Sequence, residues 1–168
     1  MLSGQGSNLL SILKKDKIKK KLNIISIVSN NGISNEIKKF LFTNKMKIRV
    51  YENILKLETY FFYDADLIFS VGFMKSIPLS IISKFQVINL HPSLLPKYKG
   101  LMTHKRTLIN KEKFGGFSIH LVNKYLDEGK LLSQIKYKIN TKKESELVTA
   151  HKKTENELVY TELLKVLD

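Results

Sequence analysis

The chain has 168 residues, of which 43% are hydrophobic, and this is enough for a core, so we expect a single domain over residues 1–168. The absence of cysteine excludes disulfides and thiolate metal sites, and no apolar run is long enough to cross a bilayer or to act as a signal peptide, so a cytoplasmic protein is expected. The net charge of +14 is spread along the chain rather than clustered, and a nucleic-acid partner is therefore not expected.

The first half of the chain alternates between helix and strand patterns. A glycine loop at residues 4–8 opens a helix, which ends in the densest basic run, residues 14–21, interpreted as solvated. A β-branched strand is expected at residues 22–30, and Ser34 is expected to cap a helix that runs to about Asn44. Strands then follow at residues 47–51, 66–71 and 86–90, with helical stretches at residues 54–63 and 78–83. This alternation is typical of a parallel sheet with helices on its faces.

After Gly100 the pattern changes. A helix is expected at residues 103–110, and two β runs at residues 115–122 and 131–139 lie on either side of Asp127-Glu128-Gly129, like the strands of a hairpin. Residues 143–167 predict a long final helix with several apolar residues for burial. The sequence contains no repeat and no sign of a linker.

The end of the strand at residues 86–90 is the most informative part of the sequence. Asn89 and His91 are two residues apart, so a strand presents the amide and the imidazole on one side of its pleat. Pro92 and Pro96 prevent the ladder from continuing, and the chain leaves as a stiff loop beside both side chains. Taken alone, Asp127 would more often be a turn residue and Asn89 a cap, but the three together suggest catalysis.

Residues 89–104, Asn-Leu-His-Pro-Ser-Leu-Leu-Pro-Lys-Tyr-Lys-Gly-Leu-Met-Thr-His, resemble the signature of the phosphoribosylglycinamide formyltransferases, which are folate-dependent enzymes of purine synthesis. Three further segments match in the same order: residues 2–9, residues 71–75, and residues 118–122 running on to 126–129. The resemblance implies an α/β fold with a Rossmann-like, mostly parallel sheet flanked by helices, and ligands at the carboxyl ends of the strands.

The resemblance also implies that Asn89, His91 and Asp127 are the catalytic residues, with no metal required. Asn89 is able to donate its amide hydrogens to a developing oxyanion. His91 suits the same hydrogen bond or proton transfer, because it titrates near neutral pH. Asp127 would orient His91 or raise its basicity.

Further residues are implied to bind the substrates. Gly6, Ser7 and Asn8 at a helix start suit the phosphate of glycinamide ribonucleotide, with Lys153 as an additional basic residue. The plainer alternatives are a tight turn that caps a helix and a solvated lysine. The folate pocket is implied to include four residues after the strand at 66–71, which would otherwise be ordinary core: Phe73, Met74, Lys75 and Ile77.

Two residues near the implied site have open roles. His120 is expected either to line the site or to be a hydrogen-bonded structural histidine. Counting from Asp127 without gaps places Asn156 where the family commonly has a glutamate for the substrate amine, so Asn156 or a neighbouring glutamate is expected to take that place. The glycine loop also follows Met1 after only a few residues, and the first strand is therefore expected to be truncated.

The sequence therefore predicts an enzyme that transfers a formyl group from 10-formyltetrahydrofolate, its cosubstrate, to the amino group of glycinamide ribonucleotide by direct attack of the amine. One alternative is another enzyme with the same donor, similar to methionyl-tRNA formyltransferase or to the deformylase. Another is a non-catalytic, basic nucleotide- or RNA-binding remnant of the fold. The expected partners are the two small-molecule substrates, without a membrane, and the expected assembly is a monomer or homodimer.

Overall fold

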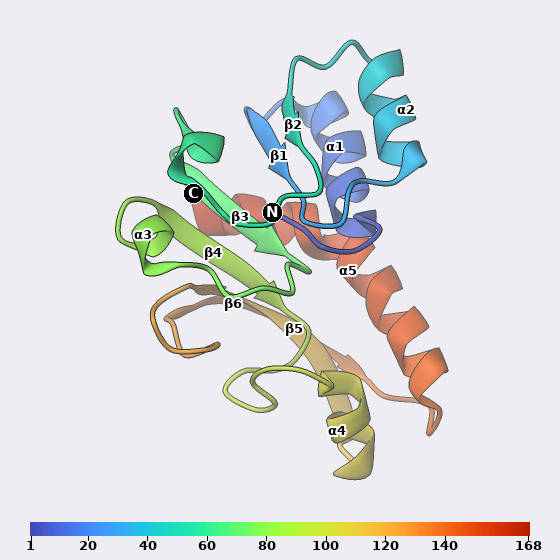
Figure 1. Cartoon of the computed structure of the whole chain (residues 1–168). Helices are drawn as coiled ribbons and strands as arrows, with labels where there is room; N and C mark the ends of the chain where they lie inside the picture. The colour runs from blue at the N-terminus through green and yellow to red at the C-terminus, as the bar shows by residue number, and fades with distance from the viewer. The chain divides into compact units, whose positions relative to one another are not determined.

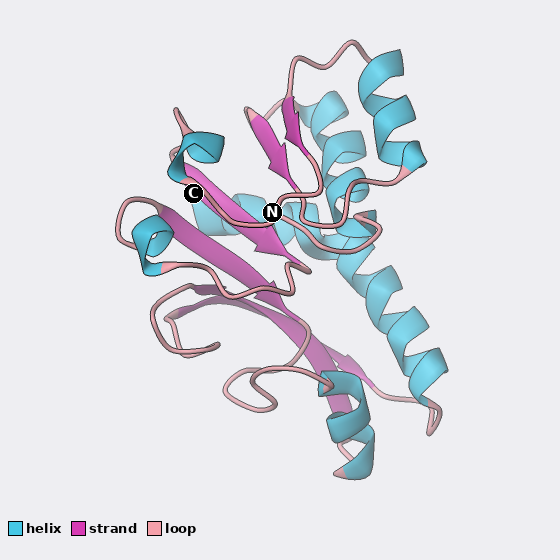
Figure 2. Cartoon of the chain, in the orientation of Figure 1, coloured by secondary structure: helices cyan, strands magenta, loops and turns pink.

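The computed structural model describes residues 1–168, and the chain divides into two compact units, Met1–Val87 and Ile88–Asp168. Both units contain helices and strands (Figure 2). The single domain expected over the whole chain stays a prediction. No helix combines the length and the apolar character needed to cross a membrane.

The first unit contains a parallel strand pair with helices beside it. Its elements are α1 (Ser7–Lys19), β1 (Ser26–Val28), α2 (Asn35–Thr43), β2 (Arg49–Tyr51), the 3-10 helix η1 (Thr59–Phe62), β3 (Leu67–Val71) and α3 (Leu79–Ile82). β1 and β2 pair in parallel, and α1 and α2 lie next to them (Figure 1). Ser34 caps α2 as predicted, because its hydroxyl accepts a hydrogen bond from Ile37 N (3.4 Å).

One predicted helix is much shorter in the structure. The pattern at residues 54–63 predicts a helix, but only Thr59–Phe62 forms a helical turn. The rings of Phe61 and Phe62 are both buried and pack in different directions, Phe61 against Tyr51 and Phe62 against Phe85. Aromatic packing against two separate parts of the chain, β2 and the bend at Phe85, therefore replaces the single apolar face that a longer helix would need.

Residues 1–3 lie where a short first strand is predicted, and Leu2 forms a single β-bridge there. Leu2 N donates to Val28 O at the end of β1 (3.0 Å), and Leu2 bridges Ser29 in parallel. On the other side, Ser3 N donates to Gly72 O (3.1 Å), just after β3. The segment thus lies between β1 and β3, and its hydrogen bonds satisfy backbone groups that both strands would otherwise leave unpaired.

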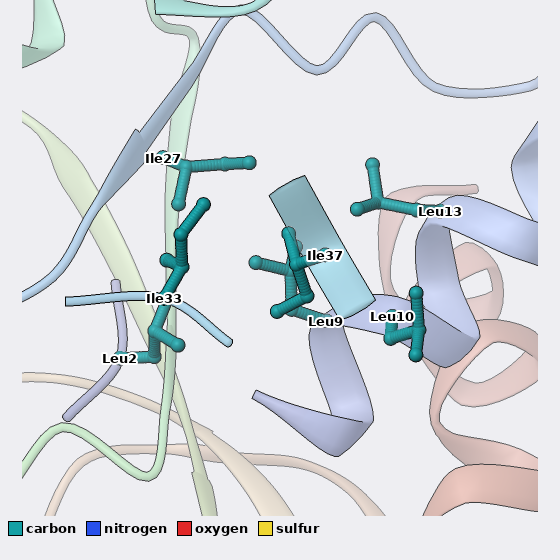
Figure 3. Packing of buried hydrophobic residues seen from close by; sticks show 7 residues of the cluster. All are labelled: Leu2, Leu9, Leu10, Leu13, Ile27, Ile33 and Ile37. Carbon is teal, nitrogen blue, oxygen red and sulfur yellow. The ribbon is translucent and has the colours of Figure 1, made fainter. Parts of the chain in front are cut away.

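One hydrophobic cluster of the first unit packs α1 against β1 and α2. Figure 3 labels its seven buried residues: Leu2, Leu9, Leu10, Leu13, Ile27, Ile33 and Ile37. Gly6 precedes α1 with a φ of 76°, and a Cβ on it would approach Ile37 Cδ1 to 2.6 Å. The turn into α1 therefore requires a glycine, both for its backbone angle and for its closeness to the core.

The second unit is built on antiparallel strands. Its elements are β4 (Gln86–His91), whose first two residues belong to the first unit, α4 (Thr103–Ile109), β5 (Phe114–Leu121), β6 (Leu131–Lys138) and α5 (Glu144–Leu167). β5 pairs antiparallel with both β4 and β6, and α5 packs on β5 and β6. The α/β class, the hairpin and the long final helix are therefore confirmed, with parallel pairing in the first unit and antiparallel pairing in the second.

Candidate active site

The pairing of β4 with β5 brings polar side chains to one face of the strands. Asn89 is opposite His120, and His91 is opposite Ser118. Side chains of directly opposed residues point to the same face, and Asn89 Nδ2 lies 3.3 Å from His120 Nε2. Asn89 and His91 therefore face the same side, as their spacing predicts.

A buried carboxylate joins the two imidazoles. Asp127 Oδ2 lies 3.2 Å from His91 Nδ1 and Asp127 Oδ1 lies 3.4 Å from His120 Nε2, while the Asp127 side chain is only 7% exposed. Gly100 N also donates a hydrogen bond to Asp127 Oδ2 (2.8 Å). We call Asn89, His91, His120 and Asp127 the His–Asp cluster.

The turn that carries Asp127 runs against the end of β5. Asp127 has a φ of 53°, in the left-handed region that aspartate tolerates better than most residues. A Cβ on Gly129 would lie 1.6 Å from Leu121 O, and Leu121 N donates to Lys130 O (2.9 Å). The close approach requires glycine at 129, and it holds the Asp127 carboxylate beside β5.

Backbone carbonyls determine where the imidazoles carry hydrogen. His91 Nε2 lies 2.9 Å from Tyr98 O, and His120 Nδ1 lies 2.8 Å from Leu121 O. Since a carbonyl oxygen only accepts, we assign a hydrogen to each of these two nitrogens. The other nitrogen of each imidazole faces the Asp127 carboxylate.

The pKa values indicate a carboxylate beside a neutral imidazole near pH 7. Burial is the largest influence on Asp127 and raises its pKa, but the contact with His120, the hydrogen bond from Gly100 N and the charges that the two histidines carry when protonated bring this pKa below its ordinary value. Burial lowers the pKa of His91, and the Tyr98 hydrogen bond and the Asp127 charge only partly oppose this. His91 is therefore free to accept a proton, and Asp127 is charged and able to stabilise the imidazolium.

The loop after β4 is anchored to β5 and β6 by a buried hydroxyl. Ser118 Oγ accepts a hydrogen bond from Leu95 N (3.1 Å) and donates one to Ser93 O (2.6 Å). Gln134 Nε2 donates to Leu95 O (3.0 Å) and to Ser118 Oγ (2.9 Å). Sequence reasoning missed this anchoring role of Ser118, and it missed Gln134 altogether.

The other predicted site residues lie outside this cluster and in both units. Residues 6–8 begin α1 and residues 73–77 follow β3 in the first unit, whereas Lys153 and Asn156 lie on α5 in the second. The first turn of α1 contains no acidic residue, so its backbone N–H groups face no carboxylate from that turn. Lys75 Nζ donates to Leu55 O (3.2 Å), and Met74 is 67% exposed.

Known proteins resemble this chain over most of its length. A family model described as formyl transferase matches residues 1–164. The phosphoribosylglycinamide formyltransferase of Escherichia coli K12 is 27% identical over 172 aligned residues, which cover 95% of this chain and 81% of that protein. The structure of the corresponding Coxiella burnetii protein is 30% identical, with a TM-score of 0.80 over 98% of this chain and 82% of that one. The Bacillus halodurans structure has a TM-score of 0.82 at 20% identity, covering 99% and 93%, which shows a shared fold.

Proposed function

Because the chain belongs to the formyl transferase family, we propose that it transfers a formyl group from 10-formyltetrahydrofolate to the amino group of glycinamide ribonucleotide in purine biosynthesis. Matches that span most of both chains are to phosphoribosylglycinamide formyltransferases. The observation that carries the proposal is the convergence of an amide, two imidazoles and a buried carboxylate on one face of β4 and β5.

The reaction forms one carbon–nitrogen bond and breaks another. The substrate amine attacks the formyl carbon, the carbonyl oxygen becomes an oxyanion, the bond from carbon to N10 of the folate breaks, and one proton passes from the attacking nitrogen to N10. Asn89 would donate an amide hydrogen to the oxyanion, an interaction worth about 3–4 kcal/mol when preorganised. His91 would accept and return the proton, with Asp127 stabilising the imidazolium.

The substrates require binding groups beyond the cluster. The phosphate of glycinamide ribonucleotide is proposed to bind the backbone N–H groups at the start of α1, at Gly6, Ser7 and Asn8, with Lys153 as an additional cation. The pteridine ring is proposed to lie among Phe73, Met74, Lys75 and Ile77. Asn156 or a neighbouring glutamate is proposed to face the substrate amine.

Other reactions of the same donor are not favoured. A deformylase passes the formyl group to water, and a methionyl-tRNA formyltransferase passes it to a charged tRNA. The Escherichia coli, Coxiella burnetii and Bacillus halodurans proteins, which match this chain over most of both lengths, carry neither name. A methionyl-tRNA formyltransferase of Fusobacterium nucleatum is matched over 77% of this chain but only 46% of its own length. The acceptor is therefore proposed to be the small ribonucleotide.

The test is the dependence of tetrahydrofolate release on the acceptor. Purified protein with 10-formyltetrahydrofolate is expected to release tetrahydrofolate only when glycinamide ribonucleotide is added. Asn89→Ala and Asp127→Ala are each expected to lower kcat/KM at least ~100-fold, because each removes a group that acts in the transition state. Formate released without an amine would indicate a deformylase, and salt-sensitive RNA binding without turnover would indicate a binding protein.

A further inference from the structure

The segment Tyr98-Lys99-Gly100-Leu101, called segment 98–101, contacts both His91 and Asp127 through its backbone. Tyr98 O accepts the hydrogen of His91 Nε2 (2.9 Å), and Gly100 N donates to Asp127 Oδ2 (2.8 Å). The position of this segment therefore determines the position of the His91 imidazole relative to the Asp127 carboxylate.

Backbone preference does not hold segment 98–101 in this conformation. Tyr98 has a φ of 58° and Gly100 a φ of 76°. Met102, the residue after the segment, also has a φ of 58°. The left-handed conformation costs about 1–2 kcal/mol for each residue other than glycine. Contacts with other parts of the second unit must offset that cost.

Arg106 on α4 makes several of these contacts with one side chain. Its Nη1 donates to Lys99 O (2.6 Å) and lies 3.4 Å from Leu101 O. Its guanidinium carbon lies 5.3 Å from the centre of the Tyr98 ring. Only two of the 29 basic residues in this chain are arginine, and a lysine provides neither the planar set of donors nor the stacking surface.

The other side-chain contacts that hold the segment are weaker or reach only one of its ends. Ser93 Oγ lies at 3.5 Å from Tyr98 O, the limit for a hydrogen bond. Lys99 Nζ lies 2.9 Å from Glu128 Oε1, but these side chains are 38% and 48% exposed, and such pairs contribute about 0–1 kcal/mol. Tyr98 Oη donates to Glu112 Oε1 (2.8 Å). This hydrogen bond holds the Tyr98 ring but not the backbone carbonyls of the segment.

We propose that Arg106 is a positioning residue of the active site. Its guanidinium holds segment 98–101 in place, and that segment in turn holds the His91 imidazole and the Asp127 carboxylate in position relative to each other. Arg106 itself contacts no substrate. The expected effect on turnover rests on the proposed function, whereas the expected effect on the His91 hydrogen bond does not.

The experiment follows the ring N–H of His91 by NMR in the full chain. The chain has four histidines, so each ring signal is assignable by single substitution. In the unchanged protein the His91 Nε2–H is expected to exchange slowly with water, since it is bonded to Tyr98 O. Arg106→Gln and Arg106→Lys are both expected to speed this exchange at least tenfold. Lys105→Gln, an exposed basic neighbour on α4, is the matched control and is expected to leave it unchanged.

Turnover provides a second measurement. Both Arg106 variants are expected to lower kcat by about 10-fold to 100-fold with little change in KM, because misplaced groups slow the chemical step more than they weaken binding. Slow exchange that persists in both variants would overturn the proposal. Faster exchange in Arg106→Gln but not in Arg106→Lys would mean that only the charge of Arg106 matters, and this would overturn the proposal. Loss of folding in both variants would mean that Arg106 is needed for the fold, and this would overturn the proposal as well. If the unchanged protein does not transfer formyl groups, the exchange measurement still decides.

Discussion

Asp127 contacts His91, His120 and the N–H of Gly100, and its carboxylate links the two imidazoles of the His–Asp cluster. Its charge raises the pKa of His91, while burial, the larger influence, lowers it. The protonation of His91 is therefore set by desolvation, which lowers its pKa, against the Tyr98 hydrogen bond and the Asp127 charge, which raise it.

This competition predicts the pH dependence of turnover. Below its pKa His91 is protonated and no longer accepts a proton, so kcat/KM is expected to fall on the acid side only below about pH 6.5, the ordinary histidine value. Asp127→Asn removes a charge that raises the His91 pKa. In this variant the acid-side fall of kcat/KM is therefore expected at still lower pH, and kcat/KM is expected to be much smaller at every pH. The measurement is kcat/KM against pH for both proteins. An upward shift of the limb in Asp127→Asn would contradict this assignment.

Gly129 offers a separate test of how Asp127 is placed. A Cβ at this position would lie 1.6 Å from Leu121 O, so Gly129→Ala must move either the turn or β5. We expect a loss of about 2–3 kcal/mol in the free energy of unfolding, with lower turnover. Gly4→Ala is the control, because a Cβ on Gly4 would meet no atom within 4 Å. Denaturant unfolding of both variants checks the expectation, and equal stability would argue against the close approach.

At the scale of elements, a buried polar contact joins β6 to α5. Tyr137 Oη lies 2.7 Å from His151 Nδ1, and His151 Nε2 lies 2.7 Å from Glu155 Oε1. His151 is 2% exposed, and its ring lies 4.5 Å from that of His104 on α4. The arrangement is consistent with a His151 ring that donates to Glu155 and accepts from the Tyr137 hydroxyl.

Removing that hydroxyl is expected to weaken the packing of α5 on the sheet. Tyr137→Phe leaves His151 Nδ1 buried without this partner, and we expect a loss of about 1–3 kcal/mol in the free energy of unfolding. Tyr125→Phe is the matched control, because Tyr125 is 57% exposed, and its loss is expected to stay within about 0.5 kcal/mol. Thermal or denaturant unfolding distinguishes the two. A loss in Tyr125→Phe as large as that in Tyr137→Phe would contradict the role given to the buried contact.

Local patterns predicted elements well where one periodicity dominates. The helix after Ser34 follows from its cap and apolar spacing, and β5 and β6 follow from two β runs around a turn. The stretch at residues 54–63 was wrongly predicted as a helix, because the packing of Phe61 and Phe62 against separate parts of the chain is not visible in a local pattern. Tertiary contacts override helical propensity in such a segment.

At the scale of the whole molecule, the chain has a net charge of +14, and both substrates of the proposed reaction are anionic. A positive field increases the local concentration of such ligands. The alternation of strands and helices predicted the α/β class. The pairing of residues 1–3 with β1 and β3 was not predictable, since it depends on hydrogen bonds between segments far apart in the sequence.

The sequence by itself determined that Asn89 and His91 face the same side, because the period of two in a strand is a local property of the backbone. It also marked Asp127, although only through resemblance to a family. The tertiary structure decided that Asp127 meets both imidazoles and that Tyr98 O and Gly100 N hold the pair. Those contacts depend on the conformations of two loops, and a loop conformation is set by the side chains and backbone packed around it rather than by its own sequence pattern.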